Sequence, residues 1–400
     1  MTPSIALLLS VATILLLLRL KVHPGPAIFI GGLVLSLLVL PPADTPRQIL
    51  ATMTDLQTWR LVGIFLCAFI LSKLMEQRGM LTKLAHTLES IGPKMAMHVV
   101  PSVIGMVPMP GGALVSATAM KGLAERLRLS PAQSTYINFW FRHLWELAVP
   151  VYPSVIAASI VLAVPLSTVV ITMLPVIPLM TAFGGIVSYR ILRNAPRAMS
   201  HDLTRRQLGR ELLRASWPVL LLVAMVLAGV EAVAAFLIVS VAVAVQQRVS
   251  RTEAKEAVRY ALGGKILFLL FAVMLYKDLV GASGAAYSLF SDMQSAGIPP
   301  AAILIALPLL IGFAAGLSMA FVGIAFPLML PFIITADGLD ASALFLAYVA
   351  GGLGYMVSPL HLCLILSAEF FKARLGDVYR LMIPPLIAVI GVALLAYLLL

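Results

Sequence analysis

Apolar blocks long enough to cross a lipid bilayer recur along the whole of this 400-residue chain. A hydrocarbon core of about 30 Å needs roughly 20 apolar residues in helical form, with about 17 as the lower limit. Hydrophobic residues make up 61% of the chain and charged residues only 11%, so too little polar surface is available to cover it in water. A transmembrane β-barrel would instead show alternating segments of about ten residues. The sequence therefore predicts an all-α polytopic membrane protein, whose helices pair their backbone polar groups within lipid.

The same order of blocks occurs twice, at an offset of about 208 residues. Each half contains three spans, an interrupted stretch that we expect to form a re-entrant helical hairpin, a broken helix and a closing span. In the first half these elements are expected at 4–20, 25–41, 60–77, 95–129, 132–164 and 166–189. In the second half they are expected at 216–230, 232–247, 262–280, 298–335, 341–370 and 378–400. We therefore predict a first repeat over 1–192, a basic connector over 193–214 and a second repeat over 215–400.

Proline and glycine mark the points where the interrupted stretches break. Two prolines and two glycines fall between Val107 and Gly112, where a helix cannot continue. The matching break in the second half lies between Gly312 and Ser318. The broken helices are expected to be interrupted at 150–153 in the first half, and at 351–354 and 358–359 in the second. Interrupted apolar segments at matching positions of two halves are typical of a transport site near the bilayer midplane.

The distribution of basic residues predicts opposite orientations for the two halves. If the N-terminus lies outside the cell, 24 of the 28 Lys and Arg residues fall in cytoplasmic loops. Such a bias fixes the orientation of multi-pass proteins. The first half then begins outside and the second begins inside, so the repeats have inverted topology. We expect an inner-membrane protein with both termini on the non-cytoplasmic side.

The net charge of +11 is explained by the same cytoplasmic loops, so it does not indicate a nucleic-acid partner. We expect the arginines of the connector to contact anionic lipid. Cys67 and Cys363 lie in apolar segments without CxxC or histidine-rich spacing, so neither a disulfide nor a metal site is predicted. The first block lacks a basic leader and a small-residue cleavage site, which favours a retained span over a signal peptide.

The hairpin tips are the first candidate site. Half-helix N-termini inside a membrane direct N–H donors and partial positive charge at an anion. In the first half the break at Pro110, Gly111 and Gly112 opens such an N-terminus, whose first turns present Ser116 and Thr118. Ser318 and Gly323 hold the analogous place in the second half. The alternative is that these glycines only allow close helix packing.

The second candidate site is a polar group within the first broken helix, comprising Asn138, Arg142, His143 and Glu146. Asn138, Arg142 and Glu146 are spaced i, i+4, i+8 and should share one helix face. Charges at this depth are costly, and they usually pair or serve transport. In the functional interpretation Arg142 binds an anion, while Glu146 or His143 carries a proton. The alternative is a structural Arg142–Glu146 ion pair.

The second broken helix adds Ser358, Pro359 and His361. His361 follows the break directly and corresponds to Tyr152 in the first half. A lone histidine is often a packed, hydrogen-bonded residue, but at a helix break it can also serve as a ligand or proton relay.

Two motifs resemble a known family. The hairpin tip Pro108 to Ala117 and the run Gly354 to Leu364 are similar to an uncharacterised integral-membrane family, a domain of unknown function within the ion-transporter superfamily. That superfamily includes divalent-anion/sodium symporters and citrate and gluconate permeases. The resemblance implies a scaffold part, a mobile transport part with two opposed hairpins, a homodimer and elevator-type alternating access. The Ser-Asn-Thr triplets of the dicarboxylate symporters are absent here, so substrate and coupling ion do not carry over.

These patterns predict a secondary transporter for a small organic anion, such as a carboxylate, driven by H⁺ or Na⁺. No cofactor is expected beyond a Na⁺ coupling ion. A cation/proton antiporter on the same scaffold is the alternative, followed by a channel. An intramembrane enzyme is disfavoured because no His-Glu-x-x-His, paired intramembrane Asp or Gly-x-Ser-x-Gly motif occurs.

Overall fold

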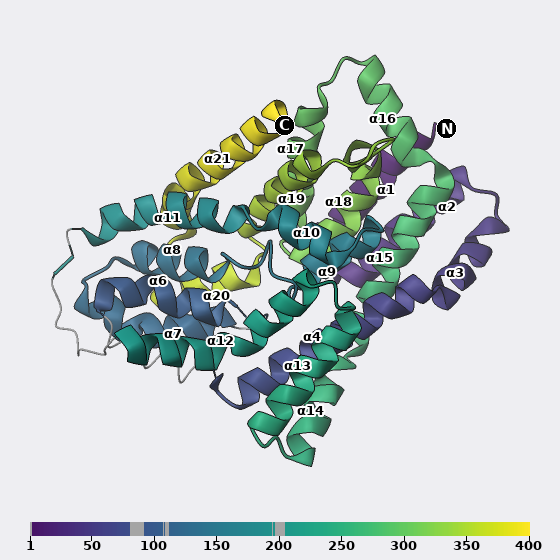
Figure 1. Ribbon diagram of the computed structural model, residues 1–400. Helices are drawn as coiled ribbons and strands as arrows, with labels where there is room; N and C mark the ends of the chain where they lie inside the picture. Colours follow the sequence, from purple (N-terminus) through teal and green to yellow (C-terminus); the bar gives the residue numbers. More distant parts are fainter. Residues whose placement is uncertain (1, 81–91, 107, 109–111, 194, 197–204) are drawn as a thin grey trace.

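The computed structural model of the chain describes all residues except 1, 81–91, 107, 109–111, 194 and 197–204 (Figure 1). The first half forms α1 (Pro3–Arg19), α2 (Pro24–Val39), α3 (Asp44–Thr54), α4 (Leu56–Gln77), α6 (Pro93–Ile104), α7 (Gly112–Arg126), α8 (Pro131–Arg142), α9 (Pro153–Val161), α10 (Leu166–Met173) and α11 (Val176–Leu192). The second half forms α12 (Arg205–Leu227), α13 (Ala232–Gln246), α14 (Arg251–Ala261), α15 (Gly264–Ser283), α16 (Ala285–Ser295), α17 (Pro300–Ala315), α18 (Ser318–Ile333), α19 (Ala341–Met356), α20 (Leu362–Phe371) and α21 (Leu375–Leu399). A two-residue strand pair, β1 (Ile334–Thr335) and β2 (Gly338–Leu339), joins α18 to α19. The predicted all-α polytopic class is confirmed.

Among the described residues, three helical segments are long and apolar enough to cross a membrane: Leu56–Gln77, Leu166–Leu192 and Leu375–Leu399. The bent pair Leu267–Ser283 and Ala285–Ser295, with an angle of 60°, adds a fourth if it counts as one span. The other predicted spans form shorter apolar helices of 10–17 residues. On α21, apolar side chains such as Ile387 and Leu395 are more than half exposed, as expected for a lipid-facing surface.

Local sequence explains where the helices around the breaks begin and end. Proline occupies the first turn of α6, α8, α9 and α17, where its missing N–H costs no hydrogen bond. Ser130 adds a capping box with Gln133 at the start of α8. Gly316 ends α17 with φ 63°, a left-handed conformation that suits glycine. The predicted break of the second hairpin therefore lies where the sequence placed it.

Two of the predicted breaks are wrong: one does not exist and the other begins earlier than predicted. The run 351–354 does not interrupt a helix, because α19 continues through it to Met356. Its glycines instead permit close contact: a Cβ at Gly354 would lie 2.3 Å from the Leu309 carbonyl oxygen. In the first half α8 already ends at Arg142, so the break spans 143–152 rather than 150–153. The break in the first half is therefore much longer than its counterpart, which spans 357–361.

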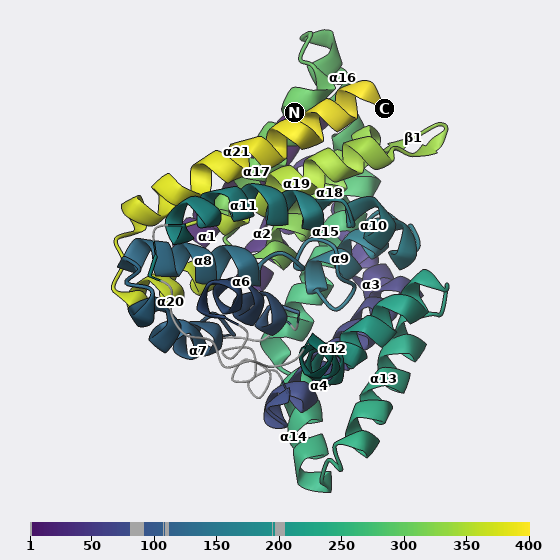
Figure 2. The ribbon, with the colours of Figure 1, turned by 60° about the vertical axis from the view of Figure 1, so that its left-hand side comes forward.

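Helices of the two halves pack against each other in reciprocal pairs. Taken in chain order, α2, α3 and α4 correspond to α13, α14 and α15. The helix α2 packs on α15 as α13 packs on α4, and α3 packs on α15 as α14 packs on α4. The hairpin helices behave in the same way, because α7 packs on α20 as α18 packs on α9. The N- and C-termini lie at the same end of the molecule, opposite α14 (Figures 1 and 2).

The helices α8, α18 and α19 lie inside the protein. Every residue of α19 from Ala343 to Met356 is buried, as is almost all of α18. In α8 the buried run extends from Ser134 to Arg142. Non-helical backbone at membrane depth is tolerated only where protein or a polar cavity surrounds it. The break after α8 meets that condition, because all but one of residues 143–152 are buried. At the break before α20, Ser358 and His361 are buried whereas Pro359 and Leu360 are exposed.

Adjacent glycines of α11 test how tightly this interior is packed. A Cβ added at Gly184 would lie 1.9 Å from Nε1 of Trp140, which is fully buried and hydrogen-bonded to the Met180 carbonyl. We expect Gly184→Ala to destabilise the protein by about 1–3 kcal/mol through overpacking. At Gly185 an added Cβ meets nothing within 4 Å, so Gly185→Ala should be neutral or slightly stabilising. Thermal unfolding of both variants in detergent, followed by tryptophan fluorescence, compares them; equal melting temperatures would refute the close contact.

Candidate functional site

Two helix breaks, the start of α7 and the turn before α18 meet in the interior. The chain leaves α8 at Arg142 and enters α9 at Pro153, while the second break lies between α19 and α20. The start of α7 touches Arg142, and the turn before α18 touches His361. The site is therefore assembled from segments that lie more than 200 residues apart in sequence.

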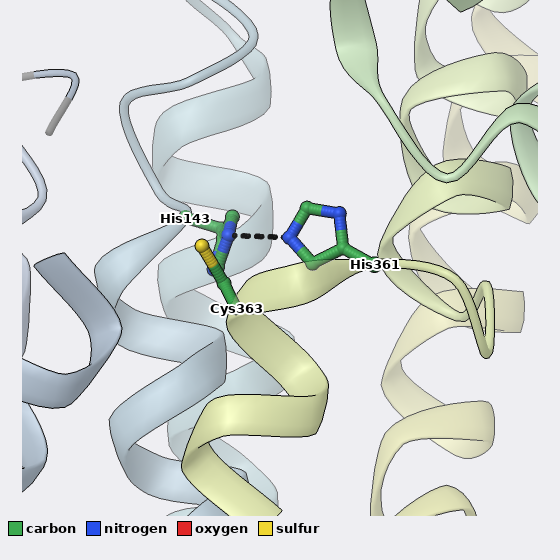
Figure 3. Close-up of side chains that lie close together, drawn as sticks. All are labelled: His143, His361 and Cys363. Carbon is green, nitrogen blue, oxygen red and sulfur yellow. Dashed lines mark hydrogen bonds between the residues drawn. The ribbon is translucent and has the colours of Figure 1, made fainter. Parts of the chain in front are cut away.

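A pair of buried histidines connects the two breaks (Figure 3). His143 caps the C-terminus of α8 and His361 precedes the first turn of α20. Their Nε2 atoms lie 3.1 Å apart. His143 Nδ1 faces the Phe139 carbonyl at 2.6 Å, and His361 Nδ1 faces the Gly316 carbonyl at 3.1 Å. Each ring is therefore held at Nδ1 by a backbone carbonyl, and the two Nε2 atoms face each other.

Arg142 lies against the N-terminus of α7. A Cβ added at Gly112 would stand 2.5 Å from one terminal guanidinium nitrogen of Arg142, so a larger residue there would force this side chain to shift. Arg142 is 3% exposed, and another N–H of its guanidinium donates to Cys363 Sγ at 3.6 Å. A guanidinium and the positive end of a helix dipole thus share one location, which favours an anion between them.

Glu146 lies in the break after α8, beside the start of α18. Its carboxylate oxygen is 3.4 Å from His143 Nε2, and the hydroxyl groups of Ser318 and Tyr355 lie close to it. The Tyr355 hydroxyl has no hydrogen-bond partner of good geometry among the described residues. The negative charge of Glu146 offsets the positive end of α18. The two hairpin tips therefore differ in charge: Arg142 adds to one and Glu146 neutralises the other.

The prediction that Asn138, Arg142 and Glu146 share one helix face is wrong for Glu146. Asn138 and Arg142 belong to α8, but the helix ends at Arg142 and Glu146 follows in irregular backbone. Glu146 pairs with His143, and Arg142 interacts with it electrostatically. The helical spacing failed because the break begins at His143, seven residues before Pro150.

The structure brings together about half of the predicted site residues. Gly112, Arg142, His143, Glu146, Ser318, Ser358 and His361 all lie at the breaks or tips. Pro110 and Gly111 lie outside the described residues.

Other predicted residues lie apart from this cluster. Ser116 bonds within α7 to the Ala113 carbonyl, and Thr118 is exposed. A Cβ at Gly323 would strike Val273 at 2.4 Å, which is a packing contact between α18 and α15. Pro359 is exposed at the turn before α20. A site role for these four residues remains a prediction.

Asn138, which was predicted as a site residue, positions the helices around Arg142. Its amide donates to the Ala113 carbonyl at 3.0 Å and to Ser367 Oγ at 2.9 Å. It therefore ties α8 to α7 and α20 just beneath Arg142 and Cys363. The side chain fixes the distance between the first hairpin tip and the second break.

Sequence reasoning missed Cys363 and Gly105. Cys363 lies two residues after His361, and its sulfur reaches the histidine pair; no local spacing reveals this, because His143 comes from the other half. Gly105 follows α6, and a Cβ there would lie 2.0 Å from the Arg142 carbonyl oxygen. The hydroxyl of Tyr152 donates to the Gly105 carbonyl, which adds a second tie to the first break. Cys67 and Cys363 are both free thiols.

This arrangement of helices is the fold of a polytopic membrane transporter. The chain is similar in structure to the YdaH transporter of Alcanivorax borkumensis, whose crystal structure has an unusual topology, with a TM-score of 0.66 and 16% identity over 90% of this chain and 89% of that one. The chain belongs to the family described as protein of unknown function (DUF401), which it matches over residues 1–400. A comparison with curated proteins gives no match.

This match confirms the expected membership of a family of unknown function. At 16% identity the structural likeness establishes a shared fold and nothing about substrate. The wider relation to divalent-anion/sodium symporters and to citrate and gluconate permeases stays a prediction.

Proposed function

We propose that this protein is a secondary active transporter for a small organic anion, such as a carboxylate, coupled to H⁺ or Na⁺. The observation that carries the proposal is the contact between the Arg142 guanidinium and the start of α7 at Gly112. Two positive groups buried side by side favour an anion close to them. The single negative charge of Glu146, which interacts with Arg142, is smaller than the sum of the guanidinium charge and the partial charges of the two helix N-termini. A carboxylate suits the planar guanidinium, which can bind it through two parallel hydrogen bonds.

The reciprocal packing of the halves supports inverted repeats. When helix 2 of one half packs on helix 4 of the other, and the converse also holds, the halves are related by an approximate two-fold axis, as in an isologous interface. Combined with the basic-residue bias, this packing supports an axis in the membrane plane, which would relate two inverted repeats. Both termini at one end of the molecule agree with their proposed non-cytoplasmic location.

Elevator-type movement and a homodimer complete the proposal. The hairpins and broken helices would form the transport part, and the reciprocal bundle around α2, α4, α13 and α15 would form the scaffold. This division is supported by a difference in burial, because α18 and α19 are almost fully buried next to the breaks while α13 of the scaffold presents an exposed apolar face.

A cation/proton antiporter is the second candidate on the same scaffold. Glu146 favours it, because it is the acidic side chain buried at this depth in the described chain. The nearby guanidinium opposes it, since Arg142 would repel a cation from the same place.

Uptake by proteoliposomes distinguishes the candidates. We expect labelled carboxylates to accumulate when an inward H⁺ or Na⁺ gradient is imposed, and an ionophore that dissipates the gradient should abolish accumulation. An uncharged isostere of each carboxylate serves as the control. Exchange of Na⁺ for H⁺ without any anion movement, seen with a lumenal pH dye, would reject the proposal in favour of the antiporter.

A further inference from the structure

The facing nitrogens of His143 and His361 require a positively charged species between them. Each Nδ1 lies against a backbone carbonyl, which can only accept a hydrogen bond, so each Nδ1 carries a hydrogen. A neutral imidazole has a single N–H, so both Nε2 atoms then present lone pairs. These lone pairs face each other at 3.1 Å, and two acceptors cannot form a hydrogen bond.

We propose that His143 Nε2, His361 Nε2 and Cys363 Sγ bind a divalent transition-metal ion of the zinc class. The three atoms lie within 4.8 Å of one another (Figure 3). In a tetrahedral zinc site, with Zn–N bonds of about 2.0–2.1 Å, two ligand nitrogens lie about 3.3 Å apart. The observed separation of 3.1 Å matches that edge closely. An ion between the rings accepts both lone pairs and removes the conflict.

The surroundings of the three ligands suit a metal site. Metal-binding histidines usually donate their second ring N–H to a carbonyl or carboxylate, as both rings do here. Cys363 would bind as a thiolate and release its proton on metal binding. The thiolate keeps a lone pair that accepts the hydrogen bond from Arg142. Glu146 Oε2, at 3.4 Å from His143 Nε2, is the oxygen nearest to a fourth position.

The sulfur distinguishes a metal ion from a shared proton. A proton between the two rings would satisfy both nitrogens, but it would give the adjacent thiol no part in the arrangement. Thiolate and imidazole together select zinc-class ions over Mg²⁺ and Ca²⁺, which prefer oxygen. One ligand follows α8 and two flank the start of α20, so the ion would tie the break of one half to the break of the other. This site goes beyond the transport proposal and does not depend on it.

Cobalt titration of the purified full-length protein in detergent tests the site. After treatment with a chelator, we expect one equivalent of Co²⁺ per chain to produce visible d–d bands of tetrahedral intensity and a near-ultraviolet thiolate charge-transfer band. Zn²⁺ should displace the cobalt and bleach both features. Cys363→Ser should abolish the charge-transfer band, and His361→Gln should weaken binding beyond the 10–100-fold typical of losing a supporting partner.

Matched variants separate the site from adventitious binding. Cys67→Ser removes the other cysteine, and His23→Gln removes a histidine at the start of α2; both should retain the spectrum and the affinity. Retained cobalt bands in Cys363→Ser and His361→Gln would overturn the proposal. So would the absence of cobalt and zinc binding in well-folded wild-type protein, which would favour a proton shared between the two rings.

Discussion

Arg142→Ala should reduce carboxylate uptake by at least about 30-fold at subsaturating substrate. Removing one member of a buried, charged hydrogen-bonded pair costs about 2–5 kcal/mol, and 2 kcal/mol corresponds to roughly a 30-fold change. The guanidinium lies at the first residue of α7, where a bound anion would interact with both positive groups. Initial uptake rates in proteoliposomes, normalised to the amount of reconstituted protein, measure the effect.

Two further arginine variants make that measurement specific. Arg142→Lys keeps the charge but loses the planar, two-pronged geometry, so it should recover only part of the activity. Arg60 bonds to Glu231 at the partly exposed start of α4, away from the breaks, and Arg60→Ala should transport at nearly the wild-type rate. If Arg142→Ala takes up carboxylate as fast as the wild type, the anion site does not include this residue.

The apolar blocks and the proline and glycine residues that break them were sufficient to predict the order of the long apolar helices. The apolar blocks predicted the ends of α1, α2 and α13, and the outer ends of the hairpin α17–α18, to within about two residues, whereas α4 begins four residues earlier than expected. The short helices α3, α14 and α16 were not predicted, because they are too polar or too short to give a membrane signal. The glycine run 351–354 was misassigned, because glycine serves close packing as well as helix breaking and sequence alone does not distinguish the two.

The candidate site was only partly predictable for a related reason. Arg142, His143 and Glu146 were identified because charges are rare and costly within apolar segments. Their contacts were not predicted, since His361 and Cys363 reach them from the other half of the chain. These residues come together only in the tertiary structure. There, α8 ends at Arg142, so Glu146 does not lie on the helix face that its spacing predicted.

Gly105→Ala should both destabilise the protein and abolish transport. Gly105 has φ −69° and ψ −8°, a conformation open to any residue, so its backbone does not demand glycine. Glycine is required because the backbone of Arg142 lies close to it: an added Cβ would lie 2.0 Å from the carbonyl oxygen of Arg142 and 2.9 Å from the Arg142 Cα. These are backbone atoms and cannot rotate away. The end of α8 must shift, at a cost of about 1–3 kcal/mol or more.

Two control variants distinguish a displacement of Arg142 from a general loss of stability. Gly122→Ala lies on α7, where an added Cβ meets nothing within 4 Å, and it should raise stability by up to about 1 kcal/mol without slowing uptake. Gly31→Ala would place a Cβ 2.2 Å from Ile14 in the contact between α2 and α1, away from the break, so it should lower the melting temperature while sparing the uptake rate of the folded fraction. Gly105→Ala should lose uptake even below its melting transition, because the displaced backbone carries the guanidinium away from Gly112. Wild-type uptake and melting temperature in Gly105→Ala would show that α6 and the end of α8 are not in close contact.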